Sequence, residues 1–523
     1  MASLCDPQRS PLLAHAGSAS ADDVDVIETH ISFILLAGDR ALKIKKPLVL
    51  PFLDFSALES RRVACEDELR LNRRTAPELY LRVVAITGTP EAPRFVSAAD
   101  AAPIEYAVEM RRFDPDALFS KRLSRGEIDG DQVDALAEGI AAFHASLEAV
   151  EAREGSAAGI ARKNLAELGT LASGALRERI ERLGVGLEAE IARIAPVLAA
   201  RRRAGFVRDC HGDLHLANVA LVDGRPVLFD CLEFDRALRE IDVLDEVAFA
   251  FMDFHAHGRP DLAARFLNAY LERTGDYEGV VLLRFFAVHR ALVRLKVALI
   301  RSGQAEDTAD RDARPGDEIE RPLAVAEGLI GDRSARLIVT CGLAGSGKTT
   351  VSSRLVEGLG AIRLRSDVER KRMAGLEAAA RSGSGLGEGI YGPDASRRTY
   401  ARLEALAETI LKSGWPVIAD ATFLRASERA AFRALAARLG LSFRIVACTA
   451  PVDVLRARID ARSARGEDAS EADRAVLAHQ LEIAEPPAAD ELAQTATIST
   501  DAPLEEVAAA CRALAAEIRR EGA

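Results

Sequence analysis

One stretch of this 523-residue chain has the composition and spacing of a phosphate-binding loop. Residues 342–350, GLAGSGKTT, satisfy G-x-x-x-x-G-K-[ST], follow the apolar run 336–341 and open a helical pattern. Glycines let backbone N–H groups converge on phosphate oxygens, a lysine neutralises phosphate charge, and the next hydroxyl can ligate Mg²⁺. The predicted ATP-binding residues are Gly342, Gly345, Ser346, Gly347, Lys348, Thr349 and Thr350, with Thr349 also a metal ligand.

Two downstream aspartates favour a kinase over other users of such a loop. Asp367 stands just after the predicted strand 361–365, and an aspartate at a strand end can take the proton of a substrate hydroxyl. Asp420 ends the apolar segment 417–420, the form expected of a carboxylate near Mg²⁺. The simpler alternatives are a helix N-cap for Asp367 and a turn residue for Asp420. We predict Asp367 as a catalytic base and Asp420 as a metal ligand.

Arginines follow on a helical segment that begins near residue 452. Arg458 and Arg462 stand four residues apart, so they share one face of that helix. Such a pair is suited to clamping phosphates when a lid closes, although arginine-rich helical surfaces are often merely solvated. We predict both as ATP-binding residues.

A second stretch with catalytic spacing lies at residues 211–230. His211, Asp213 and Asn218 follow the spacing H-x-D-x-x-x-x-N of a kinase catalytic loop, and Asp230 stands where the D-F-G aspartate would. Asp213 would orient and deprotonate an acceptor hydroxyl, while Asn218 and Asp230 would hold Mg²⁺. A zinc site made by His211, Asp213 and His215 is the weaker alternative, because no further ligand cluster is evident.

The elements around the second stretch indicate an α+β architecture. Residues 28–47 alternate apolar and polar side chains about a Gly-Asp turn, which predicts a hairpin. Residues 56–75 have helical spacing, with Ser56 as a possible N-cap. Two more strands are expected, and the pattern predicts helices over most of residues 131–299, apart from a polar interruption at 208–235. A short sheet therefore precedes a large helical part.

The C-terminal part has a different pattern. Beyond residue 335, apolar strands alternate with helical segments, which is typical of a parallel α/β sheet. A stretch rich in Asp, Glu, Arg, Gly and Pro separates the two patterns. The predicted organisation is a loosely ordered leader (1–24), a kinase domain (25–301), a linker (302–334) and a P-loop domain (335–523).

Composition and charge narrow the partners and the compartment. Sixty-nine basic against 80 acidic residues give a net charge of −11, which disfavours nucleic acid and anionic membranes as partners. Seven scattered cysteines without a C-x-x-C pair argue against a disulfide framework and fit a reducing compartment. No signal peptide is evident at the N-terminus, and no span of about 18 uncharged apolar residues occurs. We expect a cytoplasmic protein without a membrane partner.

The C-terminal half resembles the small P-loop kinases of the polynucleotide-kinase and zeta-toxin type and, more broadly, AAA family ATPases. The resemblance rests on GLAGSGKTT, LRSDVERKR, VIADATF and LRARIDARSARGEDAS in that order. It implies Lys348 and Thr349 on the nucleotide and Mg²⁺, Asp367 as the base, and Arg370 near the acceptor. It also implies that Arg458 and Arg462 act from a lid.

The N-terminal half resembles the aminoglycoside phosphotransferase family, on the pattern H-G-D-L-H-x-x-N-V…D. The resemblance implies an ATP-binding lysine on the strand after the first hairpin, Lys43 in preference to Lys45, with Glu68, or else Glu66, as its helical partner. It implies an adenine-side hinge at Glu105–Phe113. No glycine-rich loop precedes the lysine. An aspartate of the segment REIDVLDEVAF, Asp242 or Asp245, would support the catalytic loop.

Together these features predict an ATP- and Mg²⁺-dependent phosphotransferase with two modules acting on a hydroxyl of a small-molecule acceptor. A first alternative makes the C-terminal half a 5′-hydroxyl polynucleotide kinase or a nucleotide-sugar kinase. A second makes the N-terminal half regulatory and non-catalytic.

Overall fold

The computed structural model describes residues 24–50, 53–90, 92–96, 102–151, 157–305, 315–385, 387–465 and 470–521. The predicted leader therefore lies almost wholly outside the described residues. The chain divides into two compact units. The first comprises Met1–Ile160 and Ala199–Asp253, and the second comprises Ala161–Leu198 and Phe254–Ala523.

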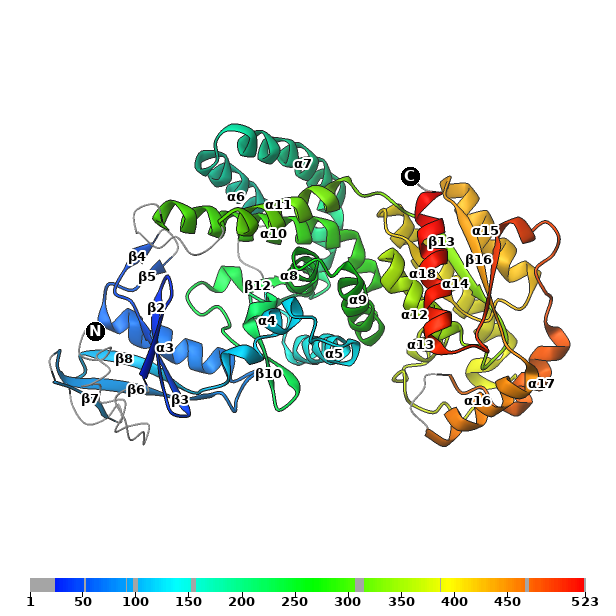
Figure 1. Ribbon diagram of the computed structural model, residues 1–523, viewed down its shortest axis with the longest axis horizontal. Coiled ribbons are helices and arrows are strands. Elements are labelled where there is room, and N and C mark those ends of the chain that lie inside the picture. Colours follow the sequence, from blue (N-terminus) through cyan, green and yellow to red (C-terminus); the bar gives the residue numbers. More distant parts are fainter. Residues whose placement is uncertain are drawn as a thin grey trace. The chain divides into compact units, whose positions relative to one another are not determined.

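The first unit begins with an antiparallel sheet of six strands, larger than the short sheet expected. Its spatial order is β1-β2-β3-β8-β6-β7 (Figure 1). The strands are β1 (Val24–Glu28), β2 (Ser32–Ala37), β3 (Arg40–Lys45), β6 (Tyr80–Thr89), β7 (Ala92–Val96) and β8 (Glu105–Arg111). One face buries an apolar cluster that includes Leu35, Leu42 and Ile44, as the alternation of the hairpin predicts. A small hairpin follows β3, formed by β4 (Val49–Leu50) and β5 (Leu53–Asp54).

Helix α3 (Leu58–Asn72) packs against β8 and β6. The prediction that Ser56 caps this helix is wrong. The N-cap position is Ala57, without a side-chain cap, and Ser56 bonds to the carboxylate of Asp54 instead. The serine side chain is thus used in the turn before the helix.

The rest of the first unit is helical around two short two-stranded sheets, as the helical pattern predicts. Its elements are α4 (Phe119–Ser124), α5 (Gly130–Ser146), β9 (Val207–Asp209), β10 (Val219–Val222), β11 (Arg225–Leu228), β12 (Glu240–Asp242) and α8 (Val243–Ala256). Strand β10 pairs with β11, and β9 pairs with β12. The segment 211–230 lies between β9 and β12, so these short sheets fix both of its ends. The α+β kinase-like fold is confirmed.

The second unit contains helices on either side of residue 302. They are α6 (Ala157–Leu171), α7 (Gly174–Arg203), α9 (Pro260–Thr274), α10 (Val280–Ala305) and α11 (Pro315–Gly331). Helix α11 lies within the segment predicted to be a linker and packs against α10. Buried apolar residues such as Leu323 and Leu329 form its packed side.

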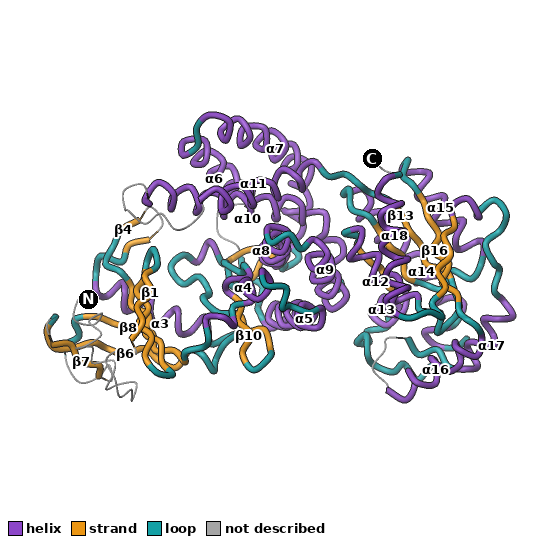
Figure 2. Tube along the Cα trace, in the orientation of Figure 1, coloured by secondary structure: helices purple, strands orange, loops and turns teal. Residues whose placement is uncertain are grey.

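The second unit also contains the predicted parallel sheet, which confirms the P-loop fold. Five parallel strands have the order β14-β15-β13-β16-β17. They are β13 (Leu337–Cys341), β14 (Ile362–Arg365), β15 (Val417–Asp420), β16 (Phe443–Thr449) and β17 (Thr495–Ser499). Helices α12 (Lys348–Leu359) and α18 (Leu504–Arg520) pack together over the sheet, as do α14 (Pro393–Lys412) and α15 (Ala426–Leu439) (Figure 2). The remaining helices are α13 (Ser366–Met373), α16 (Val452–Arg465) and α17 (Arg474–Ile483).

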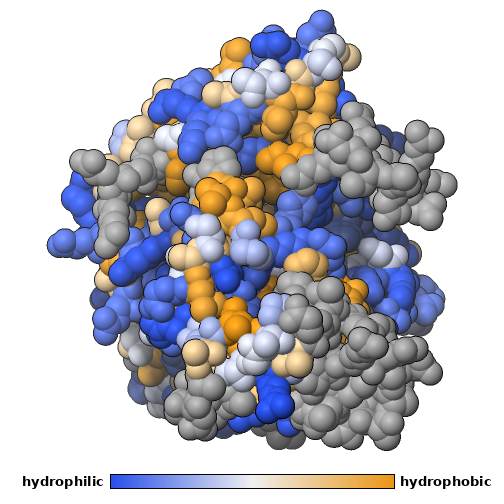
Figure 3. Space-filling view, turned by 90° about the vertical axis from the view of Figure 1, so that its left-hand side faces the viewer, coloured by the Kyte–Doolittle hydropathy of each residue, from blue (hydrophilic) through white to orange (hydrophobic). Residues whose placement is uncertain are grey.

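No helix in the described part of the chain combines the length and the apolar character needed to cross a membrane. On the face drawn in Figure 3, hydrophilic side chains are interspersed with apolar ones, which is ordinary for a protein surface.

Candidate functional site

The phosphate loop joins β13 to α12, so its backbone N–H groups lie at the start of a helix. Gly342 has φ +149°, and a Cβ there would lie 2.5 Å from the carbonyl oxygen of Cys448. Gly345 has φ +79°, and a Cβ there would lie 2.9 Å from the carbonyl oxygen of Leu455. Only glycine fits both constraints, and Gly347, also at positive φ, is the N-cap of α12. The loop is thus folded as an anion cradle.

The side chains of this cradle lack an anionic partner among the described residues. Lys348 Nζ donates to the carbonyl oxygens of Gly342 and Leu343, both at 2.9 Å. Burial lowers the pKa of Lys348, and Asp420 opposes this shift only in part. Ser346 Oγ is buried without a hydrogen-bond partner. A phosphate group would supply the missing negative charge and acceptors, so these residues fit a nucleotide.

Asp420 is held in place beside the cradle. Its Oδ2 accepts a hydrogen bond from Ser352 Oγ at 2.8 Å, and Oδ1 accepts one from Thr340 Oγ1 at 3.3 Å. It is buried and is the last residue of β15, so the alternative of a turn residue does not describe it. Thr349 and Thr350 line the same cavity. An oxygen ligand set of Thr349 and Asp420 fits Mg²⁺, which prefers such ligands.

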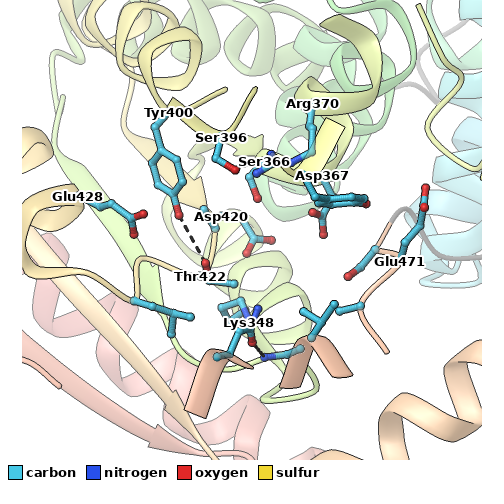
Figure 4. A pocket seen from close by; sticks show the side chains of 18 of the residues that line it. Lys348, Ser366, Asp367, Arg370, Ser396, Tyr400, Asp420, Thr422, Glu428 and Glu471 are labelled. Carbon is cyan, nitrogen blue, oxygen red and sulfur yellow. Dashed lines mark hydrogen bonds between the residues drawn. The ribbon is translucent and has the colours of Figure 1, made fainter. Parts of the chain in front are cut away.

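Asp367 faces this cavity from the other side (Figure 4). It is the second residue of α13, whose N-cap is Arg365, without a side-chain cap. No hydrogen bond or ion pair joins its carboxylate to another described residue. The alternative of a helix N-cap is therefore not realised, and the carboxylate is available to a ligand.

Arg370 lies one helical turn after Asp367 and is buried. Its Nη1 donates to the carbonyl oxygen of Ile390 at 2.8 Å and to Ser396 Oγ at 3.1 Å. Its guanidinium lies over the ring of Tyr391, 5.1 Å from the centroid. Arg370 lines the cavity on the same side as Asp367.

The cavity measures about 1410 Å³. Further polar side chains, those of Tyr400, Thr422 and Glu428, line it as well (Figure 4). The hydroxyl groups of Tyr400 and Thr422 lie 3.4 Å apart, and Glu428 lies nearby. Burial raises the pKa of Glu428. These groups can exchange hydrogen bonds with a hydroxylated molecule.

The two predicted lid arginines line the cavity, but they donate hydrogen bonds to other groups of the protein, mainly to main-chain carbonyl oxygens. Arg458 donates to the carbonyl oxygen of Gly345 at 3.2 Å and to Thr500 Oγ1 and O at 2.9 and 2.7 Å. Arg462 donates to the carbonyl oxygen of Ala472 at 2.8 Å. Arg458 therefore braces the phosphate loop from behind in this conformation.

In the first unit, Lys43, Glu68 and Asp230 meet. Lys43 Nζ lies 2.8 Å from Glu68 Oε1 and forms an ion pair with Asp230. Burial disfavours the charge of Lys43, but Asp230 and Glu68 outweigh it and raise its pKa. Asp230 has φ +62°, and its N–H donates to Tyr80 Oη at 3.1 Å. The alternate partner Glu66 instead pairs with Arg62 on the surface.

A second buried ion pair adjoins the first. Lys45 Nζ lies 2.5 Å from Glu68 Oε2 and pairs with Glu233. Burial raises the pKa of Glu233, although Lys45 opposes the shift. The sequence reasoning considered Lys45 only as a substitute for Lys43 and missed Glu233. The feature of the sequence that could have pointed to Glu233 is its position three residues after Asp230.

The residues of the predicted catalytic loop lie together beside these ion pairs. Asn218 Nδ2 donates to the main-chain oxygen of Asp213 at 2.9 Å and to its Oδ2 at 3.2 Å. The Asp213 side chain is 39% exposed, so it is open to an acceptor. The zinc alternative is not supported within the described ranges, where one group of three side chains brings ligand atoms together: His144, Cys210 and Glu246.

Glu246, a residue that the sequence did not suggest, holds the main chain of the predicted catalytic loop, whereas the expected Asp242 has a different partner. Its Oε1 accepts the N–H groups of His211 and Gly212 at 2.7 and 2.8 Å, and Oε2 lies 2.8 Å from His144 Nε2. Asp242 pairs instead with Arg201 at 2.7 Å. The sequence could not distinguish Glu246 from the neighbouring carboxylates, because it does not show which side of helix α8 faces the loop.

Comparisons with known proteins match two family models to the chain, one in its N-terminal part and one in its C-terminal part. The model of the phosphotransferase enzyme family matches residues 53–283, and an AAA domain model matches residues 337–487. Lys43 precedes the first range, whereas Glu68, Asp213 and Asp230 lie within it.

Whole-chain relatives exist in mycobacteria. Uncharacterized proteins of Mycobacterium tuberculosis (strain ATCC 25618 / H37Rv) and Mycobacterium bovis (strain ATCC BAA-935 / AF2122/97) are each 33% identical over 464 residues, covering 87% of this chain and 89% of theirs.

Among solved structures, two kinases are similar to parts of this chain. A gluconokinase from Sinorhizobium meliloti 1021 is 21% identical over 36% of this chain and 94% of its own, with a TM-score of 0.27. A choline/ethanolamine kinase family protein from Mesorhizobium loti is 14% identical over 61% of this chain and 91% of its own, with a TM-score of 0.39.

Proposed function

Because the chain belongs to the family of these mycobacterial proteins and joins a phosphotransferase domain to a P-loop domain, we propose that it is an ATP- and Mg²⁺-dependent kinase with two phosphoryl-transfer sites. Each site transfers the γ-phosphoryl group of ATP to a hydroxyl of a small-molecule acceptor. The scattered cysteines, six of which are free and buried in the described residues, favour the reducing cytoplasm as its compartment.

The observation that carries the proposal is the cavity of the second unit, which the predicted ATP-binding, metal-binding and base residues line together. Lys348, Asp420 and the unpartnered Asp367 face one space of about 1410 Å³. A single small-molecule ligand usually occupies a pocket of about 300–1,000 Å³. The cavity therefore has room for ATP and an acceptor side by side.

The reaction in this cavity follows from the placement of its charges. Asp367 takes the proton of the acceptor hydroxyl, and the acceptor oxygen forms a bond to the γ-phosphorus as the bond from phosphorus to the β–γ bridging oxygen breaks. Lys348 stabilises the negative charge on the phosphate oxygens. Thr349 and Asp420 would hold Mg²⁺, which when bound neutralises phosphate charge. The products are ADP, the phosphorylated acceptor and a proton.

The first unit holds the same roles on different residues. Asp213 is the proposed base, Asn218 and Asp230 the metal ligands, and Lys43 the phosphate partner. Here Lys43 and Asp230 pair with each other, so nucleotide binding must replace that ion pair. This observation favours a second candidate, in which the N-terminal site senses nucleotide and regulates the chain without transferring phosphate.

A phosphorylation screen tests the proposal. Wild type, Asp213→Ala and Lys348→Ala are incubated with γ-labelled ATP, Mg²⁺ and a pool of hydroxylated metabolites, and labelled products are separated. We expect one product to disappear in each variant. Label transfer that persists in both variants would contradict the assignment of sites, and loss of product in Lys348→Ala alone would favour the regulatory role.

A further inference from the structure

Helix α9 belongs physically to the P-loop fold, although it lies within the range matched by the phosphotransferase model. Ala264 on α9 is 3% exposed and packs in the same apolar cluster as Ile338 of β13 and Val351 and Leu355 of α12. Helix α9 contacts both α12 and β14. The hydrophobic core of the P-loop sheet is therefore completed by a helix that precedes the P-loop domain in the sequence and lies within the range of the phosphotransferase model.

The same helix covers the free edge of that sheet. Strand β14 is the outermost strand on its side. Asn268 Nδ2 donates to the carbonyl oxygen of Ala361 at 2.9 Å, and the N–H of Arg363 donates to Asn268 Oδ1 at 2.6 Å. The amide side chain thus supplies the donor and the acceptor that a neighbouring strand would otherwise supply.

One turn further along α9, Glu272 joins two arginines of β14. Its Oε1 accepts from Arg363 Nε and Nη2 at 3.0 and 2.6 Å, and its Oε2 accepts from Arg365 Nη1 at 3.2 Å. The Glu272 side chain is 17% exposed. Burial disfavours its charge, but the two arginines outweigh burial and lower its pKa. The carboxylate is therefore ionised and shared between both guanidinium groups.

Each arginine is connected to a different residue that lines the cavity. Arg363 Nη1 donates to Ser353 Oγ at 2.6 Å and to Ser352 Oγ at 3.3 Å, and Ser352 in turn donates to Asp420. Arg365 is the N-cap residue of α13 and lines the cavity two residues before Asp367. Glu272 is therefore connected to the proposed metal ligand through Arg363 and to the segment of the proposed base through Arg365.

The far end of α13 is also held by α9. Arg372 donates to the carbonyl oxygen of Glu272 and lies over the ring of Tyr277 at 5.9 Å. Gly275, the C-cap of α9, has φ +76°, and a Cβ there would meet Arg372 at 2.7 Å. Both ends of the short helix that carries Asp367 are thus fixed by the same turn of α9.

We propose that Glu272 is a positioning residue of the P-loop site, which holds Asp367 and Asp420 in register through Arg365 and Arg363. Phosphoryl transfer in the C-terminal half then depends on a helix of the phosphotransferase segment. Any movement of α9 is transmitted to the base and the metal ligand together. This inference rests on the proposed function of the P-loop site.

The test uses the full chain carrying Lys43→Met, so that the C-terminal site alone turns over. Glu272→Gln keeps the shape and removes the charge, Glu272→Asp keeps the charge, and Glu278→Gln is the matched control. Glu278 pairs with Arg402 at 3.0 Å but is 67% exposed. Transfer from Mg·ATP to water is measured, because that acceptor is present in every assay.

Glu272→Gln should lower kcat by about 10- to 100-fold, the effect typical of misplacing a catalytic group, with KM for ATP changed less than about twofold. Hydrogen exchange of amides 362–373 should become faster. Glu272→Asp should recover part of kcat, and Glu278→Gln should change nothing. Unchanged kcat and exchange in Glu272→Gln, or equal losses in Glu278→Gln, would overturn the inference.

A failure of the proposed function has a different signature. If ATP turnover by the wild-type chain does not fall in Lys348→Ala, the proposed function is contradicted. Hydrogen exchange would still decide whether Glu272 orders β14 and α13. If Glu272→Gln does not fold, the same two measurements on Glu272→Asp decide the proposal, since loss of kcat without faster exchange contradicts it.

Discussion

The two candidate sites differ in how their charges are balanced before any ligand binds. In the P-loop site, Lys348 bonds only to carbonyl oxygens and Asp367 has no partner among the described residues. In the N-terminal site, Lys43 and Lys45 are neutralised by Glu68, Asp230 and Glu233. The P-loop site therefore offers unbalanced charge to a nucleotide, whereas the N-terminal site must exchange internal ion pairs for ligand contacts.

The comparison predicts its largest effect at Lys348. Lys348→Ala removes the cation of the phosphate cradle, and loss of even one such electrostatic contact typically costs about 10²–10³ in rate. We expect transfer by the C-terminal site to fall at least that far, measured with γ-labelled ATP. Lys412→Ala is the control, because Lys412 is 60% exposed and pairs with Glu408 on the surface. Equal activity in the two variants would contradict the assignment.

Asp367→Asn should have the next largest effect. The amide keeps the shape of the side chain but cannot accept the acceptor's proton, and general-base catalysis typically contributes about 10²–10⁴-fold. ATP affinity, measured by calorimetry, should stay within about twofold of wild type, because Asp367 does not belong to the phosphate cradle. A near-normal transfer rate would show that another group is the base.

The buried pairs of the N-terminal site predict a stability effect. Lys45→Met leaves Glu68 and Glu233 buried with less compensation, and breaking a buried ion pair costs about 3–5 kcal/mol. Lys46→Met is the matched control, since its partner Glu28 is 65% exposed and such pairs are worth about 0–1 kcal/mol. Denaturant unfolding of both variants measures the difference. Equal free energies of unfolding would mean that the buried network is not stabilising.

Acid sensitivity should be a smaller effect of the same network. The charges of Lys43 and Lys45 hold the pKa of Glu68 below its ordinary value despite burial, and Lys43 does the same for Asp230. Stability from a lowered carboxyl pKa is present above the unfolded pKa and is lost as pH falls through the folded one. The first unit should therefore lose stability below about pH 4.

The raised pKa of Glu233 acts in the opposite direction, because that carboxyl favours its protonated form in the folded state. Unfolding free energies measured from pH 7 to pH 3 test the balance. Lys43→Met should flatten the acid-dependent part of the curve. A curve identical to that of wild type would show that Lys43 does not set these pKa values.

The sequence predicted the P-loop site more completely than the N-terminal one for a physical reason. Residues 342–350 are contiguous, and their chemistry follows from local backbone geometry. Glu246 acts through contacts across the fold, so spacing alone could not select it over neighbouring carboxylates. Glu233 stands three residues after Asp230, but its pairing with Lys45 also joins distant parts of the sequence. The packing of α9 was also beyond prediction, because Asn268 pairs with a strand edge 93 residues away in sequence.

Calorimetric titration of Mg·ATP into the full chain tests the contrast between the two sites most directly. The account predicts two binding events, a tighter one abolished by Lys348→Ala and a weaker one abolished by Lys43→Met, since only the second must break an internal ion pair. A tight event that survives Lys348→Ala and disappears in Lys43→Met would contradict it.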